Sequence, residues 1–380
     1  MTVGIQKCYH LIEYIIQNIS GNFHYRSDIG IPTINNNINM VTYASSGVDI
    51  DKGNNIVSEI KNDILKTYNE TVFSKFGDFS GLINLPMNDE YVLVTSIDGC
   101  GTKSDFLPKI SAEMPYRTLG IDIVNHSVND ILVKGGKPLF FLDYIASSNL
   151  LPENVKQAVS GMSYSCQKHK CVLIGGETAE MPGVYHTDSY DIVGCIVGIA
   201  KKTEIIDGPK NINPYDVVIG LPSIGLHTNG YSLIRKLYNQ TKMKNDLDLI
   251  RFLERHHKSY YEEIELANTN NIKINGLCHI TGGGLIENPP RVLPKNCKMV
   301  LNKKCIGNRH FDKIKTLGQL SDHEMYKTFN CGIGMLIILD KTNATKLCQL
   351  YQLQNIKYLE LGKIYEKYQY DPSVLIKSLT

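Results

Sequence analysis

The sequence predicts a protein of two α/β domains. From about residue 90 onward, apolar runs of strand length alternate with segments of helical periodicity. A charged stretch with two prolines over 201–215 interrupts this alternation and is typical of a domain connection. The length of 380 residues also suits two domains. We expect an N-terminal extension over 1–40, an N-terminal domain over 41–207 and a C-terminal α/β domain over 213–380.

Strands are predicted where β-branched and aromatic residues run together between Gly and Asp residues. In chain order these runs are 91–97, 139–146, 170–175, 190–200, 216–221 and 332–340. Helical periodicity marks 117–138, 230–239 and a charged stretch over 246–267, and a Gly-rich turn is expected at 281–284. The Asn-rich segment that ends the first 40 residues predicts a partly disordered extension.

The composition excludes several classes of protein. Hydrophobic residues make up 42%, charged residues 21%, and the formal net charge is +2, so neither a nucleic-acid partner nor a membrane surface is indicated. No apolar run reaches the roughly 18–20 residues of a membrane span, and a secretory signal is not expected. The ten cysteines form no C-x-x-C pair. We therefore expect a cytoplasmic protein with buried thiols and no zinc site.

One acidic residue follows the first predicted strand. In "VLVTSIDGCGTKSDF" the strand ends at Asp98, and the two glycines after it give backbone N–H groups access to an anion. Lys103 would then supply positive charge to a phosphate. The alternative is an ordinary turn with a solvated lysine, because the stretch matches neither a Walker A loop nor G-x-G-x-x-G.

The predicted helix within 117–138 has an unusual polar face. The apolar residues share one side at helical spacing. The opposite side carries Asp122, Asn125, His126, Asn129 and Asp130. A solvated helix face usually carries better helix formers, such as Lys, Glu and Arg, so we interpret this face as functional, with a merely solvated face as the alternative.

A second strand end carries glutamates. In "LIGGETAEMPG" the apolar run gives way to Gly175, Gly176 and Glu177. Acids after separate strands converge at one edge of a sheet, and carboxylate oxygens suit Mg²⁺, which leaves positions for phosphates and water. We predict a metal-nucleotide site made by Asp98, Asp130 and Glu177; the alternative is that Glu177 only caps a loop.

Together these stretches resemble the aminoimidazole ribonucleotide synthetase (phosphoribosylformylglycinamidine cyclo-ligase) family. The matching blocks run in family order from about residue 43 to 365 and include "DGCGTK", "GIDIVNHSVNDILVKGGKP", "GGETAEMPG", "LHTNGYS", "HITGGG" and "TFNCGIGM". The resemblance implies a two-domain ATP-binding fold and the ATP-dependent ring closure of formylglycinamidine ribonucleotide in purine biosynthesis, a ligase reaction. Its products would be aminoimidazole ribonucleotide, ADP and phosphate, with Mg²⁺ on the nucleotide.

The resemblance also implies roles for individual residues. Catalytic roles fall to Asp98, Lys103, Glu177 and His227, the last as a proton shuttle with an ordinary pKa near working pH. ATP contacts are expected at Lys61, Asp98, Asp122, Asn129, Asp130, Gly175, Gly176 and Glu177. Substrate contacts are expected at His227, Asn229, Thr281, Gly282, Gly283 and Asn330. For Lys61 and His227 the alternatives are a solvated lysine and a structural hydrogen bond.

The resemblance further implies a homodimer in which the N-terminal domains pair through their sheets, with ATP near the subunit interface. Some positions depart from the family pattern, among them Ile97 before the aspartate and Asp78 where a glycine is expected. The alternatives are another ATP-dependent enzyme of the same superfamily that phosphorylates a small molecule, and a non-catalytic paralogue. A Rossmann dehydrogenase is disfavoured because its fingerprint is missing.

Overall fold

The computed structural model describes residues 55, 58–59, 61–62, 65–85, 88–111 and 113–378. Residues 1–54 lie outside the described residues. They include the predicted extension over 1–40 and most of the block that begins at residue 43. Two sheets organise the described chain, one built from residues 81–201 and the other from residues 217–377.

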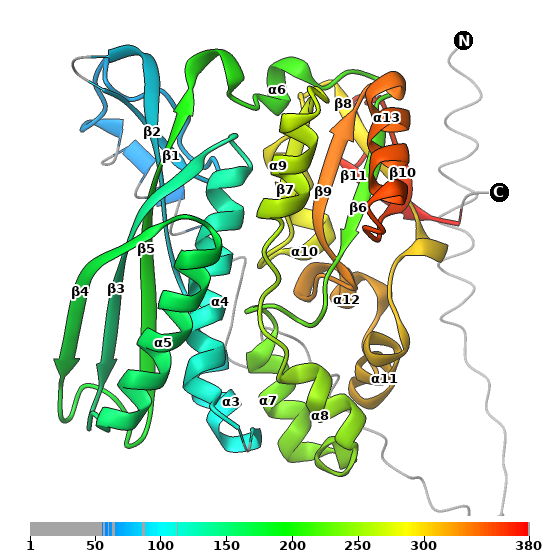
Figure 1. The fold of residues 1–380 in the computed structure, drawn as a ribbon. Coiled ribbons are helices and arrows are strands. Elements are labelled where there is room, and N and C mark those ends of the chain that lie inside the picture. The colour runs from blue at the N-terminus through cyan, green and yellow to red at the C-terminus, as the bar shows by residue number, and fades with distance from the viewer. Residues whose placement is uncertain are drawn as a thin grey trace, which may run out of the picture. The chain divides into compact units, whose positions relative to one another are not determined.

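The first sheet has five strands in the order β1-β2-β5-β3-β4. Its strands are β1 (Gly81–Leu85), β2 (Asn88–Gly99), β3 (Lys137–Ser147), β4 (Val172–Glu180) and β5 (Tyr190–Lys201). All neighbouring pairs are antiparallel except β3 and β4. Helices α4 (Pro115–Leu132) and α5 (Pro152–Lys168) cover one face, and the shorter α3 (Thr102–Ile110) follows β2 directly (Figure 1).

Two glycines bring α4 and α5 into close contact. A Cβ on Gly120 of α4 would collide with the carbonyl oxygen of Ala158, and a Cβ on Gly161 of α5 would collide with that of Arg117. Pro115 opens α4 at its first turn, where a missing N–H costs nothing. The helix is therefore held tightly on the sheet by α5, and its other side faces the second half of the chain (Figure 1).

The second sheet has six strands in the order β11-β8-β10-β6-β9-β7. The strands are β6 (Val217–Pro222), β7 (Gly276–His279), β8 (Cys297–Asn302), β9 (Ile333–Leu339), β10 (Leu359–Glu366) and β11 (Val374–Lys377). Its helices are α7 (Tyr231–Gln240), α8 (Leu247–Leu253), α9 (Tyr261–Thr269), α10 (Gly284–Glu287), α11 (Arg309–Gly318), α12 (Asp322–Thr328) and α13 (Lys341–Leu353). Every residue of β9 is buried, so this strand lies at the centre of the C-terminal core.

All six predicted strands are confirmed, and three details differ. Strand β4 runs on to Glu180 instead of ending at 175, because it pairs with β3 along its whole length. The charged stretch 246–267 forms two helices, α8 and α9, because an extended segment separates them. The predicted connection contains a short helix, α6 (Gly208–Asn211), and buries Ile206 and Ile212. It therefore packs against the rest of the structure instead of forming an exposed linker.

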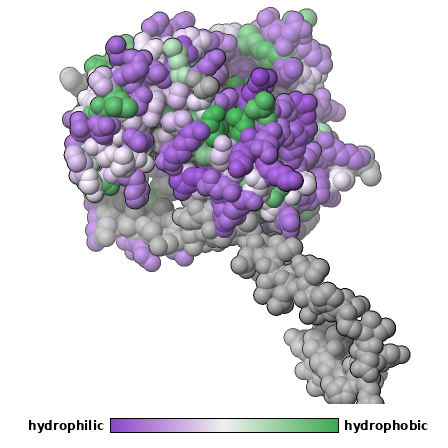
Figure 2. Space-filling model, turned by 90° about the horizontal axis from the view of Figure 1, so that it is seen from below, coloured by the Kyte–Doolittle hydropathy of each residue, from purple (hydrophilic) through white to green (hydrophobic). Residues whose placement is uncertain are grey.

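Among the described helices, none is long and apolar enough to cross a membrane. The face seen in Figure 2 is largely hydrophilic, with hydrophobic residues in small separate patches.

Candidate active site at the domain junction

The polar face of α4 is neither solvated nor open. Its five polar residues are all buried, with exposed fractions of 0–6%. They point toward the second domain and contact the segment between α8 and α9, the end of β7 and the loop before α7. The polar face that the sequence singles out is therefore a contact surface between the two domains and not a solvated helix face.

At one end of this face lies an ion pair. Lys103 Nζ is 2.7 Å from Asp122 Oδ2, and both side chains are completely buried. Lys103 also donates to the carbonyl oxygen of Arg255, while Asp122 accepts from the backbone N–H of His257 at 2.5 Å. In this structure Lys103 and Asp122 therefore contact each other and the second domain, and their expected contacts with the nucleotide stay predictions.

The asparagines of α4 hold the segment 257–260. Asn125 donates to the carbonyl of His257 at 2.7 Å. Asn129 donates to the carbonyl of Lys258 and accepts from the N–H of Tyr260. Asn129 was expected to contact ATP. In this structure its side-chain amide instead bonds to the backbone of the segment 257–260.

At the other end of the face two carboxylates meet. The hydroxyl of Ser96 lies between them, 3.1 Å from Asp98 Oδ2 and 3.4 Å from Asp130 Oδ2, and can donate its one hydrogen to either carboxylate. His126 Nε2 lies 3.5 Å from Asp98 and 4.0 Å from Asp130. Burial raises the pKa of Asp98 to about 6 and also raises the pKa of Asp130, each against the pull of His126. Two crowded carboxylates with raised pKa values are the arrangement that a divalent cation would stabilise.

Glu177 does not join these carboxylates within one chain. Across the sheet it is in register with Tyr144, Val193 and Gly99, one position beyond the row that contains Asp98. Neighbouring positions on a strand face opposite sides, and three strand spacings separate β4 from β2, roughly 14 Å. The predicted three-residue metal set is therefore wrong for a single chain: Asp98 and Asp130 come together, and Glu177 is exposed on the edge strand with Gly175 and Gly176.

The second domain contributes histidines that sequence reasoning passed over. His279 Nδ1 is 2.6 Å from Asp130 Oδ1, and its Nε2 is 3.0 Å from His257 Nε2. Thr228 lies 3.0 Å from His126. His279 opens the "HITGGG" block, and this motif could have identified it as a candidate site residue. His257 lies in a charged stretch that contains no such motif.

His227, expected to be a proton shuttle with an ordinary pKa, is buried in this structure. Its residue is 1% exposed, and burial, followed by the nearby histidines and lysines, lowers the pKa of His227 well below its ordinary value. Its ring stacks on His257 with centroids 3.9 Å apart.

Two loops of the second domain do come together as predicted. A Cβ on Gly282 would lie 3.4 Å from Asn229 Nδ2, so the "HTNG" and "TGGG" loops are neighbours. Gly283 has φ +93°, a conformation that favours glycine. Asn229 Oδ1 is buried and has no hydrogen-bond partner in the part of the chain that the structure describes, and the backbone N–H of Thr281 donates to Asn288. Asn330, in contrast, is fully used: it accepts from Ser223 and Gly332 and donates to Gly225.

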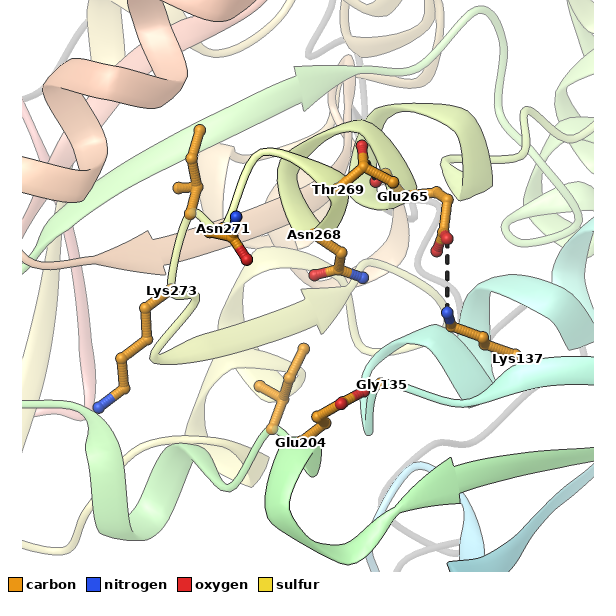
Figure 3. A pocket seen from close by; sticks show the side chains of 10 residues that line it. Gly135, Lys137, Glu204, Glu265, Asn268, Thr269, Asn271 and Lys273 are labelled. Atoms are coloured by element: carbon orange, nitrogen blue, oxygen red, sulfur yellow. Dashed lines mark hydrogen bonds and ion pairs between the residues drawn. The ribbon is translucent and has the colours of Figure 1, made fainter.

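Lys61, an expected ATP contact, and one surface pocket are further candidates for a ligand site. Lys61 is an exposed helical residue. A pocket of about 480 Å³ opens between Gly135, Lys137, Glu204 and the end of α9, where Lys137 pairs with Glu265 at 3.5 Å (Figure 3). The predicted catalytic and substrate residues are not among its described lining residues, so we place the candidate site at the carboxylates instead.

Comparison with known proteins defines the class. The AIR synthase related protein family matches with its N-terminal domain over residues 77–200 and with its C-terminal domain over residues 213–373. The chain belongs to this family. A phosphoribosylformylglycinamidine cyclo-ligase from Carboxydothermus hydrogenoformans is 39% identical over 336 residues, which cover 85% of this chain and 96% of that protein.

Solved structures share the fold at low identity. A ThiL protein complexed with AMPPCP and TMP has a TM-score of 0.57 at 14% identity, covering 94% of this chain and 97% of that one. The hydrogenase maturation protein HypE has a TM-score of 0.59 at 15% identity, covering 82% and 89%. PurL from T. maritima complexed with ADP has a TM-score of 0.52 at 13% identity, covering 78% of this chain and 43% of that one. The recognition of the family and of its two-domain α/β fold is therefore confirmed.

Proposed function

We propose that the protein is an ATP-dependent cyclo-ligase that closes formylglycinamidine ribonucleotide to aminoimidazole ribonucleotide in purine biosynthesis. ATP phosphorylates the formyl amide oxygen, the amidine nitrogen attacks the activated carbon, and phosphate leaves as the ring closes. ADP and phosphate are the other products. The similarity to a cyclo-ligase along 96% of that protein's length supports this reaction over that of the other relatives.

One observation carries the proposal: the nucleotide-type carboxylates and the loops of the second domain belong to one site. Asp130 reaches His279 of the "HITGGG" block, and His126 reaches Thr228 of the "LHTNGYS" block. A simple ATPase needs a metal-triphosphate site but no second group of polar loops beside it. A ring-closing ligase needs both, because it must hold the nucleotide and the ribonucleotide in line for phosphoryl transfer.

Asp98 and Asp130 are the residues that would hold Mg²⁺ on ATP. Their oxygens lie together with Ser96 as the shared donor, and Asp98 keeps 24% of its side chain exposed. The fit rests on the crowded carboxylates described above, which lack a lysine or arginine partner within 4 Å among the described residues. Bound Mg²⁺ would neutralise charge on the transferred phosphoryl group. The chain's own part is to hold these oxygens in place through Ser96 and His126.

Asn229, Thr281 and Gly282 are proposed to grip the ribonucleotide. The unpartnered oxygen of Asn229 can accept from a substrate hydroxyl or amine, since buried acceptors are normally satisfied. The neighbouring glycine loop lets a phosphate approach the backbone closely. Gly283 gives this loop its left-handed turn, and Asn330 holds the backbone at Gly225 and Gly332, so we assign both to positioning.

We further propose a cytoplasmic homodimer of chains with domains at 41–207 and 213–380 and an extension that the chemistry does not need. The face of the first sheet that α4 and α5 leave uncovered exposes Ile97 (68%) and Val172 (58%). Glu177 and its neighbour Tyr144 lie on this same uncovered face. Pairing of two such faces would bury the apolar residues and bring Glu177 of one chain to the nucleotide of the other, with Lys61 as a further ATP contact.

Subunit complementation tests the dimeric site. Asp98→Asn and Glu177→Gln homodimers should each be nearly inactive. Mixed in equal amounts and re-equilibrated, they should regain about a quarter of wild-type turnover, because about half of the dimers are then mixed and one of the two sites in each carries both acids. If the mixture stays as inactive as its parents although mixed dimers form, the two acids act in the same chain.

The reaction itself is tested with purified protein, Mg²⁺, ATP and formylglycinamidine ribonucleotide. ADP release should be coupled one-to-one to formation of the aminoimidazole, which diazo coupling detects. Omission of either substrate should abolish both signals. ADP release without aminoimidazole, or turnover of thiamine monophosphate in its place, would assign the chain to another branch of the superfamily.

A further inference from the structure

A cluster of buried histidines lies behind the candidate active site, and the proposed reaction does not use it. His227, His257 and His279 each offer a ring nitrogen, and these three nitrogens lie within 4.8 Å of one another. The exposed fractions of the three residues are 1%, 0% and 0%. All three come from the second domain: one from the loop before α7, one from the segment between α8 and α9, and one from the end of β7.

The hydrogen bonds of the cluster are incomplete. Within the described residues, His227 has no partner for either ring nitrogen, and His257 has none for Nδ1. Buried polar atoms are normally satisfied, so three unpartnered nitrogens in one place require an explanation. Neutral imidazole is the form that binds a metal.

The geometry also has the features of a metal centre. The Nε2 atoms of His257 and His279 are 3.0 Å apart, at the distance of a hydrogen bond between the two rings. Two nitrogens on one tetrahedral zinc ion, each at about 2.0–2.1 Å from it, lie roughly 3.4 Å apart. His279 presents its Nδ1 to Asp130 at 2.6 Å, which is the carboxylate–histidine arrangement that orients metal ligands.

The backbone at His227 adds an independent sign of constraint. Its φ is +65°, a left-handed conformation that is unfavourable for a residue with a Cβ. Such strain gathers at functional sites, where the surrounding structure enforces it. Here it directs the imidazole onto His257, whose ring it overlaps with an interplanar angle of 19°.

We propose that His227, His257 and His279 form a binding site for a divalent transition-metal ion of the zinc class, separate from the Mg²⁺ of ATP. The fourth position is left to water. Bringing the third nitrogen from within 4.8 Å to about 3.4 Å takes side-chain rotation of the stacked rings. The ion would fasten together the three segments that carry the "HTNG" and "HITGGG" loops and the partners of α4. Sequence spacing gave no hint of it, because the ligands lie 22–30 residues apart and none is a cysteine.

The site differs in chemistry from the carboxylates beside it. Nitrogen ligands select zinc, cobalt or nickel over Mg²⁺, which prefers oxygen. Asp130 serves both centres with separate oxygens, since Oδ1 faces His279 while Oδ2 faces Ser96 and His126. His126 is not a fourth ligand here, because its nitrogens already face Thr228 and the carboxylates.

Cobalt titration of the full chain tests the proposal without any activity assay. After treatment with chelator and its removal, wild-type protein should bind one equivalent of Co²⁺ with the intense visible bands of a tetrahedral ion, and Zn²⁺ should displace it. Zinc should also raise the melting temperature, because it binds the folded state alone. A wild-type chain that takes up no Co²⁺, or shows only the weak bands of an octahedral oxygen site, overturns the proposal whatever the variants do.

Variants place the ion. His257→Ala should remove the tetrahedral bands, and Asp130→Asn should weaken binding about 10–100-fold. His256→Ala is the matched control, since that neighbouring histidine is exposed and only contacts the carbonyl of His257; it should bind Co²⁺ like wild type. If the bands survive in a folded His257→Ala protein, the histidine site is refuted. The proposed ring closure can fail or succeed independently of this result.

Discussion

The two ends of the polar face of α4 carry the same kind of residue and do opposite things. At Asp122 the carboxylate meets Lys103 at 2.7 Å, and neither side chain is exposed. At Asp130, two turns further along, the carboxylate meets a second carboxylate, and Asp98 keeps 24% of its side chain exposed. The first end is a closed, neutralised pair that fastens two domains. The second is an open site with excess negative charge, ready for a cation.

An aspartate on a helix becomes structural or functional according to its neighbours. A buried pair contributes little net stability but is costly to break, because the remaining charge is left without a partner. Crowded carboxylates are destabilising in themselves and persist where a bound ligand relieves them. The first end should therefore respond to substitution in stability, and the second in activity.

The largest effect is expected at the closed end. Lys103→Met leaves Asp122 ionised and buried, so the free energy of unfolding should fall by about 3–5 kcal/mol in chemical denaturation. Adding Asp122→Asn should restore part of this loss, since its amide oxygen can still accept from His257. Lys156→Met is the control: its ion pair with Glu153 spans 3.9 Å between exposed side chains and should matter by less than about 0.5 kcal/mol. Full stability with lost turnover in Lys103→Met would instead make this lysine catalytic.

The next effect is expected at the open end. Asp98→Asn keeps the shape of the side chain but removes the charge that would hold Mg²⁺, so turnover should fall by about 10²-fold or more, or roughly 2.7 kcal/mol of barrier. The melting temperature should stay within a few degrees of wild type. Steady-state kinetics and calorimetry on the same preparation measure both. Near-normal turnover would move Asp98 to a structural role.

The pH dependence of stability sharpens the same contrast. The folded pKa of Asp98 is raised by burial to about 6, above its ordinary value of about 3.9. Between these values the folded state binds more protons than the unfolded state, so stability should fall as pH rises from about 4 to 6. Asp98→Asn should lack this part of the slope, and its stability relative to wild type should rise by roughly 2 kcal/mol across the window. Parallel pH profiles of the two proteins would contradict the raised pKa.

The smallest effect is expected at Glu177, the acid that joins neither end. It is exposed on the edge strand, so Glu177→Gln should change the free energy of unfolding by no more than about 0.5 kcal/mol. Denaturant titration measures this value, with wild type as the reference. A loss above about 1 kcal/mol would indicate that this carboxylate stabilises the β4 segment.

Much of the fold was readable from the sequence. The alternation of strand-length runs and helical patterns predicted six strands in place, because each run records the period of the element that buries it. The polar face of α4 was also found, because Asp, Asn and His are poor choices for a solvated helix. The ordered blocks from "DGCGTK" to "TFNCGIGM" identified the family.

Tertiary structure decided what each polar residue does. Lys103 and Asp122 are predicted nucleotide contacts that the second domain closes over in this structure, and Glu177 looked like a third metal ligand until the sheet order placed it on the opposite face. His257 and His279 are 22 positions apart and meet only because two segments fold over the same helix. Local patterns record burial and periodicity, which each residue feels along its own segment. Charge pairing and ligand sets depend on distances between segments, and these are fixed only when the two domains pack.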